Sequence, residues 1–310
     1  MQTLPFYIVD VFADQPYRGN QLAVFLQAGN LRTEQMQQIA QEIGFAESAF
    51  VLQDTATPAG YPARYFTVEY EVPFAGHPTL GTAFVLQQVL EKTSVPEVKL
   101  HLPVGTIPVS FSYDQQGQPD FLMMQQINPV LEEPLPADDL PLVLGLPGEA
   151  LHPEFPVQVV STGLPFLLIP LQRLEDMRQI HIKEEVLLAF LQKHHLFKTQ
   201  REDGLSVALY LFCPETYQKD RQINARMLAY ENGKVIEDAA TGSANGCLLG
   251  YLLQHEYLGP GAVDILVEQG CEINRHATIR LQGQQHPNHQ FDIRVGGQVQ
   301  LISKGEWYVH

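Results

Sequence analysis

The sequence has little positive charge and very little cysteine. It carries 19 Lys and Arg residues against 35 Asp and Glu residues, a formal net charge of −16. Nucleic acid is bound through clustered Lys and Arg that neutralise phosphates, so this composition excludes a general nucleic-acid-binding surface. The three cysteines, Cys213, Cys247 and Cys271, show no C-x-x-C spacing. They cannot all pair, which favours a reduced compartment and gives no support to a metal site.

Long hydrophobic runs are also missing. No apolar run approaches the roughly 18–20 residues that span a bilayer. The first residues, MQTLPFYIVDVFADQP, lack the basic start and apolar stretch of a signal peptide. We therefore expect a cytoplasmic protein with no membrane partner. At 310 residues and 45% hydrophobic content, the chain is long enough for two globular domains.

Two segments in the two halves of the sequence resemble each other. FAGHPTLGTAFVLQQVL and AATGSANGCLLGYLLQ each place a glycine and small polar residues before a mostly apolar helix. A helix that is apolar on all faces has to be enclosed by other elements. The pattern predicts an α+β fold of two similar domains, each with a helix threaded through a curved β-sheet. A segment rich in Pro and acidic residues from 128 to about 156 marks the boundary. We place the domains at residues 1–128 and 129–299, with the tail from about 300 to 310 returning to the first.

Both predicted central helices begin with small residues and a hydroxyl group, G-H-P-T at 76–79 and T-G-S at 241–243. The first turn of a helix has N–H groups without partners inside the helix and the positive end of the helix dipole, so it attracts an anion. Two such ends facing each other across a domain cleft would bind a small carboxylate substrate through Gly76, Thr79, Gly242 and Ser243. The alternative is ordinary capping by Thr79 and by Thr241 or Ser243.

Glu47 lies in the strand-like segment FAESAFV, on the same face as Phe45, Ala49 and Val51. A charge on an apolar face is costly unless it is paired or functional. An apolar setting raises the pKa of a carboxylate toward neutrality, which suits a general base. The alternative is a bulge at Ala46 that inverts the strand register and turns Glu47 toward water.

His77 and Asp238 complete the candidate set. By default His77 is a capping or core residue, and Asp238 is an acidic residue just before a helix, where the dipole favours it. Together with Glu47 and Ser243 they are the polar groups expected around a cofactor-free proton-transfer site. The segment ATGSANG has neither the G-K-[ST] ending of a Walker loop nor the glycines of a G-x-S-x-G nucleophile elbow.

The order of these motifs resembles the phenazine-biosynthesis-like (PhzF) isomerase and epimerase family, which is similar in fold to diaminopimelate epimerase. The resemblance runs from residue 10 to about 306, and its most specific parts are G-H-P-T-x-G and D-x-A-T-G-S-A. The matching stretches are DVFADQPYRGNQLAVF, IAQEIGFAESAF, RYFTVEYEVPFAGHPTLGTAFVL, EDAATGSANG, QGCEINRH and VGGQVQLISKGE.

The resemblance implies two epimerase-like domains, each a curved, barrel-like mixed β-sheet around a central α-helix. It also implies a site in the cleft between them, no cofactor and a homodimer. It also assigns the acid/base role to Glu47 and places the family's other site residues on His77, Asp238 and Ser243. Diaminopimelate epimerases keep a catalytic cysteine at the start of each central helix. Neither helix start has one here, and Cys247 falls well inside its helix, so two-thiol racemisation is not expected.

The sequence departs from the family pattern at several positions. The flanks of Glu47 and the residue after Asp238 differ mildly, whereas Asn274 and His276 change a loop near the expected ligand and leave the substrate open. Our leading hypothesis is an isomerase that moves a proton within a small carboxylate, cyclic or amino-acid-like. The alternatives are a serine hydrolase using Ser243, His77 and Asp238, and a non-catalytic protein that binds a small anion.

Overall fold

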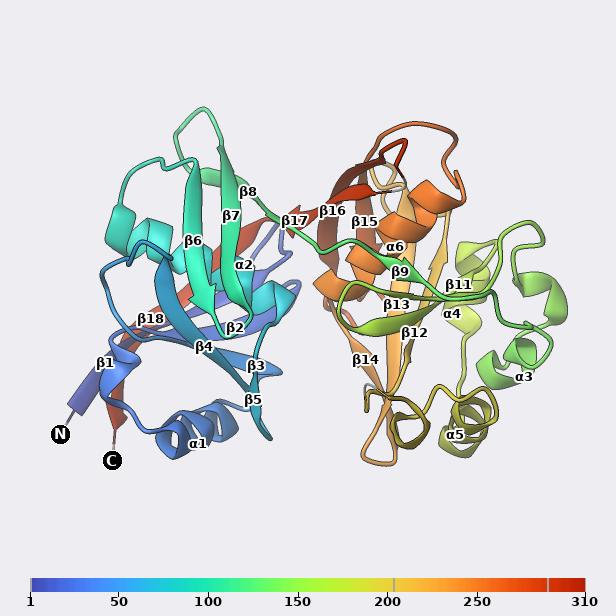
Figure 1. Ribbon diagram of the computed structural model, residues 1–310, viewed down its shortest axis with the longest axis horizontal. Helices are drawn as coiled ribbons and strands as arrows, with labels where there is room; N and C mark the ends of the chain where they lie inside the picture. The colour runs from blue at the N-terminus through green and yellow to red at the C-terminus, as the bar shows by residue number, and fades with distance from the viewer. Residues whose placement is uncertain (1, 203, 289, 310) are drawn as a thin grey trace. The chain divides into compact units, whose positions relative to one another are not determined.

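The computed structural model describes residues 2–202, 204–288 and 290–309. The chain divides into two compact units, which we call unit 1 (Met1–Gln125 with Gly296–His310) and unit 2 (Gln126–Val295). Figure 1 shows that each unit is built from strands with a helix among them.

Unit 1 contains a mixed sheet whose strands follow the order β18, β1, β2, β3, β4, β6, β7, β8, with the short β5 paired to β4. The segment β18, from the C-terminal end of the chain, pairs antiparallel with β1 at its start, from Gln2↔Val309 to Val11↔Val299. The strands are β1 (Gln2–Val11), β2 (Asn20–Phe25), β3 (Glu47–Val51), β4 (Tyr61–Thr67), β5 (Glu71–Val72), β6 (Glu97–Leu102), β7 (Gly105–Tyr113), β8 (Pro119–Gln125) and β18 (Val299–Val309).

Unit 2 contains a second mixed sheet, in the order β9, β10, β11, β12, β13, β15, β16, with β14 paired to β13. The strand β17 runs from unit 2 into unit 1, where it pairs with β8. The strands are β9 (Val130–Leu131), β10 (Gln158–Ser161), β11 (Pro165–Pro170), β12 (Ala208–Cys213), β13 (Ile223–Glu231), β14 (Lys234–Asp238), β15 (Val263–Gln269), β16 (Ala277–Gln285) and β17 (Phe291–Gly297).

The two sheets repeat one succession of pairings. From β1 through β2, β3, β4 and β6 to β7, the pairs are antiparallel, parallel, antiparallel, parallel and antiparallel. From β10 through β11, β12, β13 and β15 to β16, the pairs follow the same series. Each sheet also carries a short hairpin strand, β5 or β14, directly before its central helix. The predicted fold of two similar domains is confirmed.

The central helices are α2 (Gly76–Leu86), which continues as a π-helical turn over Gln87–Glu91, and α6 (Gly242–Gln254). The helix α2 touches strands on several sides, among them β1, β2, β3, β6, β7 and β8, which explains why its apolar residues leave no polar face. Gly81 permits the closest approach, because a Cβ there would lie 2.6 Å from Leu22 Cδ2 and 2.9 Å from Val11 Cγ2. The helix α6 packs in the same way on β10, β11 and β16.

The other helices cover the outer faces of the sheets. In unit 1, α1 (Thr33–Ile43) buries Met36, Ile39 and Ala40 and ends at Gly44, whose φ of 71° and N–H bond to the Ala40 carbonyl close the helix. In unit 2, α3 (Leu140–Leu144), α4 (Leu174–Gln179) and α5 (Glu184–Lys193) enclose a second apolar core. Short 3-10 turns lie at Ala28–Asn30, Gly148–Ala150 and Lys198–Gln200.

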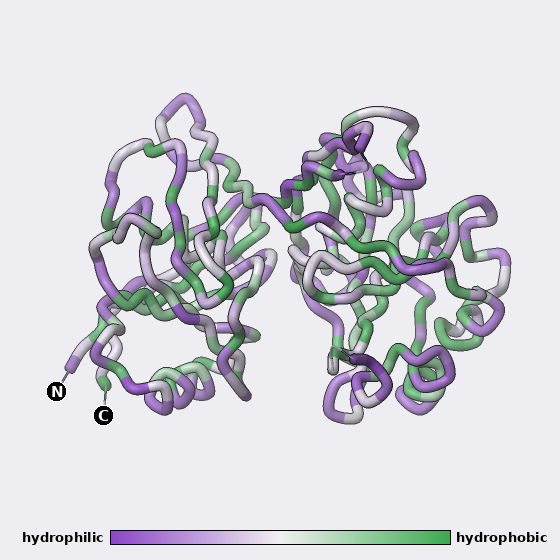
Figure 2. Tube along the Cα trace, viewed as in Figure 1, coloured by the Kyte–Doolittle hydropathy of each residue, from purple (hydrophilic) through white to green (hydrophobic). Residues whose placement is uncertain are grey.

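Polar residues lie mainly on the outer surface of the sheets and in the loops. In β6 the buried residues Val98, Leu100 and Leu102 alternate with polar ones, as expected for a strand with one face in a core. Figure 2 shows the same contrast across the chain, with hydrophobic stretches along the strands and hydrophilic colour in many of the connecting loops. Within the described residues, no helix is long and apolar enough to cross a membrane.

Candidate active site

Glu47 begins β3 and faces the central helix of unit 1. It lies opposite Thr67 in a regular antiparallel register that continues to the pair Val51↔Ala63. The bulge at Ala46 that would turn Glu47 toward water lies before this register, and the direction of Glu47 is given instead by its contact with His77. Phe45, expected on the same face, packs instead with the outer core beside α1, because the strand starts only at Glu47.

His77 lies at the first turn of α2 and meets Glu47 there. Its Nε2 is 3.5 Å from Glu47 Oε2, an ion pair when the imidazole is protonated. The His77 side chain is 7% exposed, whereas that of Glu47 is 21% exposed. The carboxylate therefore keeps access to a ligand while one of its oxygens lies beside a buried imidazole.

The first turn of α2 is stabilised by a side-chain bond to its N-cap carbonyl, and its N–H groups are not capped by a hydroxyl. Thr79 Oγ1 donates to the carbonyl of Ala75, the N-cap residue, at 2.8 Å. The buried Tyr65 hydroxyl donates in turn to Thr79 Oγ1 at 3.4 Å, and burial raises the pKa of Tyr65. Because the Thr79 hydroxyl is engaged with a carbonyl, the capping alternative is wrong for this helix.

The first turn of α6 is arranged in a similar way in unit 2. Thr241 is the N-cap residue, but its side chain does not bond to the first-turn amides of this fully described helix. Its Oγ1 donates instead to Asp238 Oδ2 at 2.6 Å. Asn245 Nδ2 donates to the Thr241 carbonyl at 3.0 Å, the same position that Thr79 serves in α2. The capping alternative through Thr241 is wrong here too, and Gly242 and Ser243 begin the helix directly beyond it.

The buried carboxamide of Gln269, at the end of β15, fixes this turn. Its Nε2 donates to the Asp238 carbonyl at 3.0 Å and to Thr241 Oγ1 at 3.1 Å. Its Oε1 accepts from the Thr241 N–H, from Asn245 Nδ2 and from the Tyr210 hydroxyl, at 3.3, 3.2 and 3.1 Å. Sequence reasoning missed this residue, although the glycine that follows it is a visible turn signal.

Matching salt bridges lie near the start of the central helix in each unit. Arg64 forms a two-pronged bond to Glu71, with Nε–Oε1 at 2.7 Å and Nη2–Oε2 at 2.5 Å. Arg226 forms the same bond to Glu237, at 3.0 and 2.7 Å. Each arginine lies in the first strand of the hairpin that leads into a central helix, and each glutamate stands five residues before the first helical glycine (76 − 71 = 242 − 237 = 5).

This correspondence identifies the position in unit 2 that matches Glu47. The pair Ser48↔Phe66 corresponds to Leu209↔Leu228, since Phe66 and Leu228 each lie two residues after the arginine. Glu47 therefore corresponds to Ala208, the first residue of β12. The two units share the same strand pairing around this position, but only unit 1 has a carboxylate there.

The loop between β15 and β16 borders the first turn of α6. Gly270 has φ of +73°, and a Cβ there would lie 2.7 Å from the Ala239 carbonyl oxygen, so this position requires glycine. The loop carries the unusual Asn274 and His276. It is held by Glu272, whose Oε1 accepts from the Tyr217 hydroxyl at 2.9 Å. Burial raises the pKa of Glu272.

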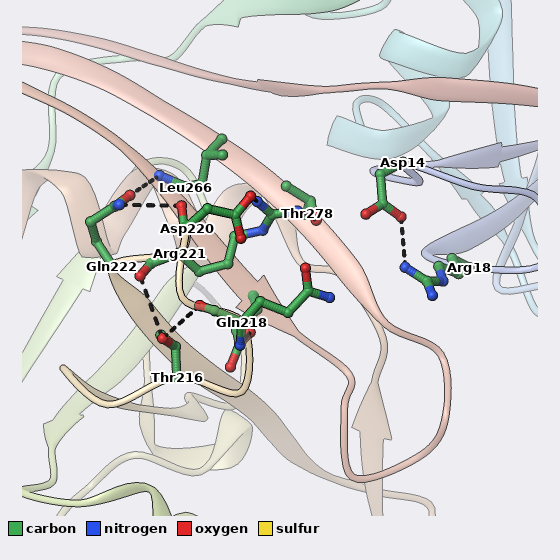
Figure 3. A network of polar contacts seen from close by, with 10 residues as sticks. Asp14, Arg18, Thr216, Gln218, Asp220, Arg221, Gln222, Leu266 and Thr278 are labelled. Carbon is green, nitrogen blue, oxygen red and sulfur yellow. Dashed lines mark hydrogen bonds and ion pairs between the residues drawn. The ribbon is translucent and has the colours of Figure 1, made fainter.

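The loop after β12 that carries Tyr217 is itself fastened to the sheet. Figure 3 shows the Thr216 hydroxyl donating to the carbonyls of Gln218 and Arg221, at 2.9 and 3.4 Å. Arg221 Nη2 donates to Thr278 Oγ1 at 3.1 Å. The pair of Arg18 Nη1 and Asp14 Oδ1 in the same view, 3.0 Å apart, belongs to unit 1.

The cysteines are not arranged for thiol chemistry at these helix ends. Cys213 and Cys247 are buried, and burial raises the pKa of each thiol to about 12. Cys271 is partly exposed. Among the described residues, no group of three or more His, Cys, Asp and Glu side chains is placed to hold a metal ion.

The structure therefore places the sequence-derived candidates in two sets. Unit 1 brings Glu47, His77, Gly76 and Thr79 to one helix start, and unit 2 brings Asp238, Gly242 and Ser243 to the other. Glu47 and His77 are in contact, and Asp238 is joined to the N-cap residue of α6.

Comparison with known proteins agrees with this arrangement. The model of a family described as phenazine biosynthesis-like protein matches residues 9–305. The chain belongs to this family. It is 30% identical to trans-2,3-dihydro-3-hydroxyanthranilate isomerase of Pseudomonas aeruginosa, over 98% of this chain and 99% of that one. It is 32% identical to an uncharacterized isomerase of Pasteurella multocida, over 98% and 94%.

Solved structures give the same result for the fold. A phenazine biosynthesis protein of the PhzF family from Bacillus anthracis superposes with a TM-score of 0.84 at 25% identity, covering both chains fully. A hydroxyproline epimerase from Agrobacterium vitis shares the fold alone, with a TM-score of 0.62 at 12% identity over 98% of this chain and 92% of that one. The family and fold expected from the sequence motifs are confirmed, and the chain is an isomerase of this phenazine biosynthesis-like family.

Proposed function

We propose that this isomerase moves a proton within a small carboxylate-bearing substrate without a cofactor, and that Glu47 is its general acid and base. The observation that carries the proposal is the pair of Glu47 and His77 in unit 1, with Ala208 at the matching position in unit 2. Inversion at one carbon by two bases needs one group on each side of the substrate. A single carboxylate can instead remove a proton and return it to another atom of the same molecule.

The proton transfer runs between a substrate carbon and a Glu47 oxygen. Glu47 takes the proton in its carboxylate form, and the neutral acid then delivers it to a second carbon. The imidazole of His77, 3.5 Å away, orients the carboxylate and interacts most strongly with its charged form. A positioned acid or base of this kind contributes about 10²–10⁴-fold to the rate.

In this proposal the first turns of the central helices are anion-binding sites for the substrate carboxylate. Gly76 and Thr79 lie at the first turn of α2, and Gly242 and Ser243 at that of α6. The backbone N–H groups of Gly76, Gly242 and Ser243, together with the Ser243 hydroxyl, stabilise the negative charge that develops when the carbon loses its proton. Asp238, held by Thr241, orients a polar substituent of the substrate.

The test uses Glu47→Gln, which keeps the shape of the side chain and removes its basicity. A thermal-shift screen of small carboxylates, including trans-2,3-dihydro-3-hydroxyanthranilate, first identifies a ligand. Deuterium uptake into that ligand in heavy water is then followed by NMR. We expect Glu47→Gln to bind the ligand and to lose about 10²–10⁴-fold in exchange rate.

The matched control is Glu97→Gln, at an exposed glutamate of unit 1 that lies 3.6 Å from Lys99. Its exchange rate should equal that of the wild type. Exchange at the wild-type rate in Glu47→Gln would show that Glu47 is not the base. A wild-type protein that binds the ligand but catalyses neither exchange nor turnover would support the non-catalytic alternative.

Two further expectations are tested in parallel. Labelling of Ser243 by a fluorophosphonate probe would favour the serine hydrolase, whereas we expect no labelling. The homodimer implied by the family resemblance is checked by light scattering on the purified chain.

A further inference from the structure

Gln126, the first residue of unit 2, has a buried side chain with no hydrogen-bond partner. It is 8% exposed, and its Nε2 is buried without a partner among the described residues. Its backbone N–H is satisfied by the Ile293 carbonyl at 2.9 Å, so the deficit belongs to the carboxamide alone. A buried polar group without a partner is costly and rare in a folded protein.

Gly246 in α6 shows where this carboxamide lies. A Cβ at Gly246 would be 3.1 Å from Gln126 Cγ and 3.4 Å from Gln126 Oε1. In a helix the Cα–Cβ direction tilts toward the N-terminus, so the space beside a Cβ at Gly246 lies over the turn of Gly242 and Ser243. Thr162 confirms this placement, because its Oγ1 would be 3.2 Å from the same Cβ and it donates to the Ser243 carbonyl at 3.2 Å.

Two exposed apolar residues lie close in the chain to Gln126 and Thr162. Ile127 and Leu164 are 63% and 47% exposed. The Cδ1 of Ile127 would be 4.0 Å from a Cβ on Gly163, the residue between Thr162 and Leu164. Large aliphatic side chains beside the start of a helix lose water favourably when an apolar group covers them.

We propose that Gln126 is a substrate-binding residue that donates a hydrogen bond to the substrate carboxylate at the first turn of α6, and that Ile127 and Leu164 contact an apolar ring carrying that carboxylate. This inference rests on the proposed function and names the class of its substrate. No protein group fixes the orientation of the carboxamide in the described chain, so a half-turn about its last side-chain bond presents the NH2 group to the ligand. The ligand supplies the partner that the protein leaves out.

The experiment titrates benzoate, acetate and benzamide into the intact protein by calorimetry. Benzoate has both the charge and the ring, acetate lacks the ring and benzamide lacks the charge, so benzoate should bind at least about 10-fold more tightly than either. Gln126→Met, which keeps the length of the side chain and removes its polar atoms, should weaken benzoate binding about 10-fold. Its unfolding temperature should stay equal to that of the wild type or rise, because a buried group without a partner has been removed.

The matched control is Gln158→Met, at a buried glutamine of the same unit whose Nε2 donates to the Glu132 carbonyl and whose Oε1 contacts His255 beyond the other end of α6. This variant should unfold at a lower temperature and bind benzoate like the wild type. In two-dimensional NMR, the side-chain NH2 signals missing from Gln126→Met should be the ones that shift when benzoate binds.

The outcomes separate this inference from the proposed function. If Ser243→Ala weakens benzoate binding and Gln126→Met does not, Gln126 is not a ligand and the helix site stands. A lower unfolding temperature with unchanged affinity in Gln126→Met would assign Gln126 a structural role and overturn the inference. Failure of the wild type to bind benzoate in the millimolar range, or equal binding of benzamide, would overturn it together with α6 as the carboxylate site. Glu47 would still be tested independently by exchange.

Discussion

Replacing Gln269 by leucine should destabilise unit 2 more than most single changes do. The substitution keeps the bulk of the side chain and removes both ends of a carboxamide that serves five hydrogen bonds. Asn245 retains its bond to the Thr241 carbonyl, and Thr241 Oγ1 retains its bond to Asp238. The Tyr210 hydroxyl, the Thr241 N–H and the Asp238 carbonyl lose the partners that Gln269 supplied.

The magnitude follows from these three groups. Each buried polar group left without a partner costs about 1–3 kcal/mol, so we expect a loss of about 3–6 kcal/mol after partial relaxation. This is a large share of the roughly 5–15 kcal/mol by which a domain is typically stable. Urea denaturation followed by circular dichroism measures the change, and hydrogen exchange should show the α6 amides opening first. Gln158→Leu is the control, with two hydrogen bonds at the side chain and a smaller expected loss of about 1–3 kcal/mol.

The charged variant Gln269→Glu tests the direction in which stability changes with pH. Burial and the neighbouring Asp238 carboxylate should raise the folded-state pKa of the introduced acid above its unfolded value. Stability should therefore recover as pH falls and the acid becomes protonated, because the neutral form can donate to the Asp238 carbonyl. A loss below about 1 kcal/mol in Gln269→Leu, or no recovery in acid for Gln269→Glu, would refute the view that this carboxamide fixes the start of α6.

Three further changes test other parts of the structure. Burial raises the folded-state pKa of Glu272, so the contribution of this residue to stability is present in acid and is lost as pH rises. Glu272→Gln should therefore raise the urea midpoint at about pH 8 and leave it unchanged at about pH 4. An equal increase at both pH values would contradict this prediction. In the native protein at neutral pH, iodoacetamide should modify the partly exposed Cys271 first, because the other two thiols are buried and their pKa is raised to about 12. Peptide mass spectrometry measures the order of labelling, and equal labelling of all three cysteines would count against the buried positions. Gly81→Ala should cost about 1–3 kcal/mol by overpacking α2 against β1 and β2, whereas Gly148→Ala, which meets open space, should be close to neutral in the same urea assay.

The sequence predicted the parts of the fold that depend on local pattern. The central helices were visible because their residues are apolar on every face. The direction of Glu47 followed from strand alternation, although Phe45 did not, since alternation fails where the strand has not yet begun.

Long-range pairing could not be read from local pattern. The sequence placed the C-terminal tail with the first domain but did not give the register of β18 on β1, and Gln269 reaches Thr241 only because β15 lies beside β13 in the sheet. The matching arginine and glutamate pairs were hidden for a different reason. Their partners are 7 residues apart in unit 1 and 11 in unit 2, so the longer hairpin of unit 2 breaks the spacing that a repeat search needs.

The combination of a repeated frame and unequal side chains bears on how the proposed reaction is divided. Both units support a central helix with an arginine–glutamate pair whose glutamate lies five residues before the first helical glycine, and with a polar side chain on the N-cap carbonyl. Each unit thus has a helix start of the kind that attracts an anion. At the position that matches Glu47, however, unit 2 has Ala208, which cannot exchange a proton. If both units bound the substrate and both supplied a base, the frame would suit inversion at a carbon; with one base, it suits a proton that leaves and returns through the same carboxylate. On this view the duplicated parts bind the substrate, and the chemistry depends on the place where the duplication is broken.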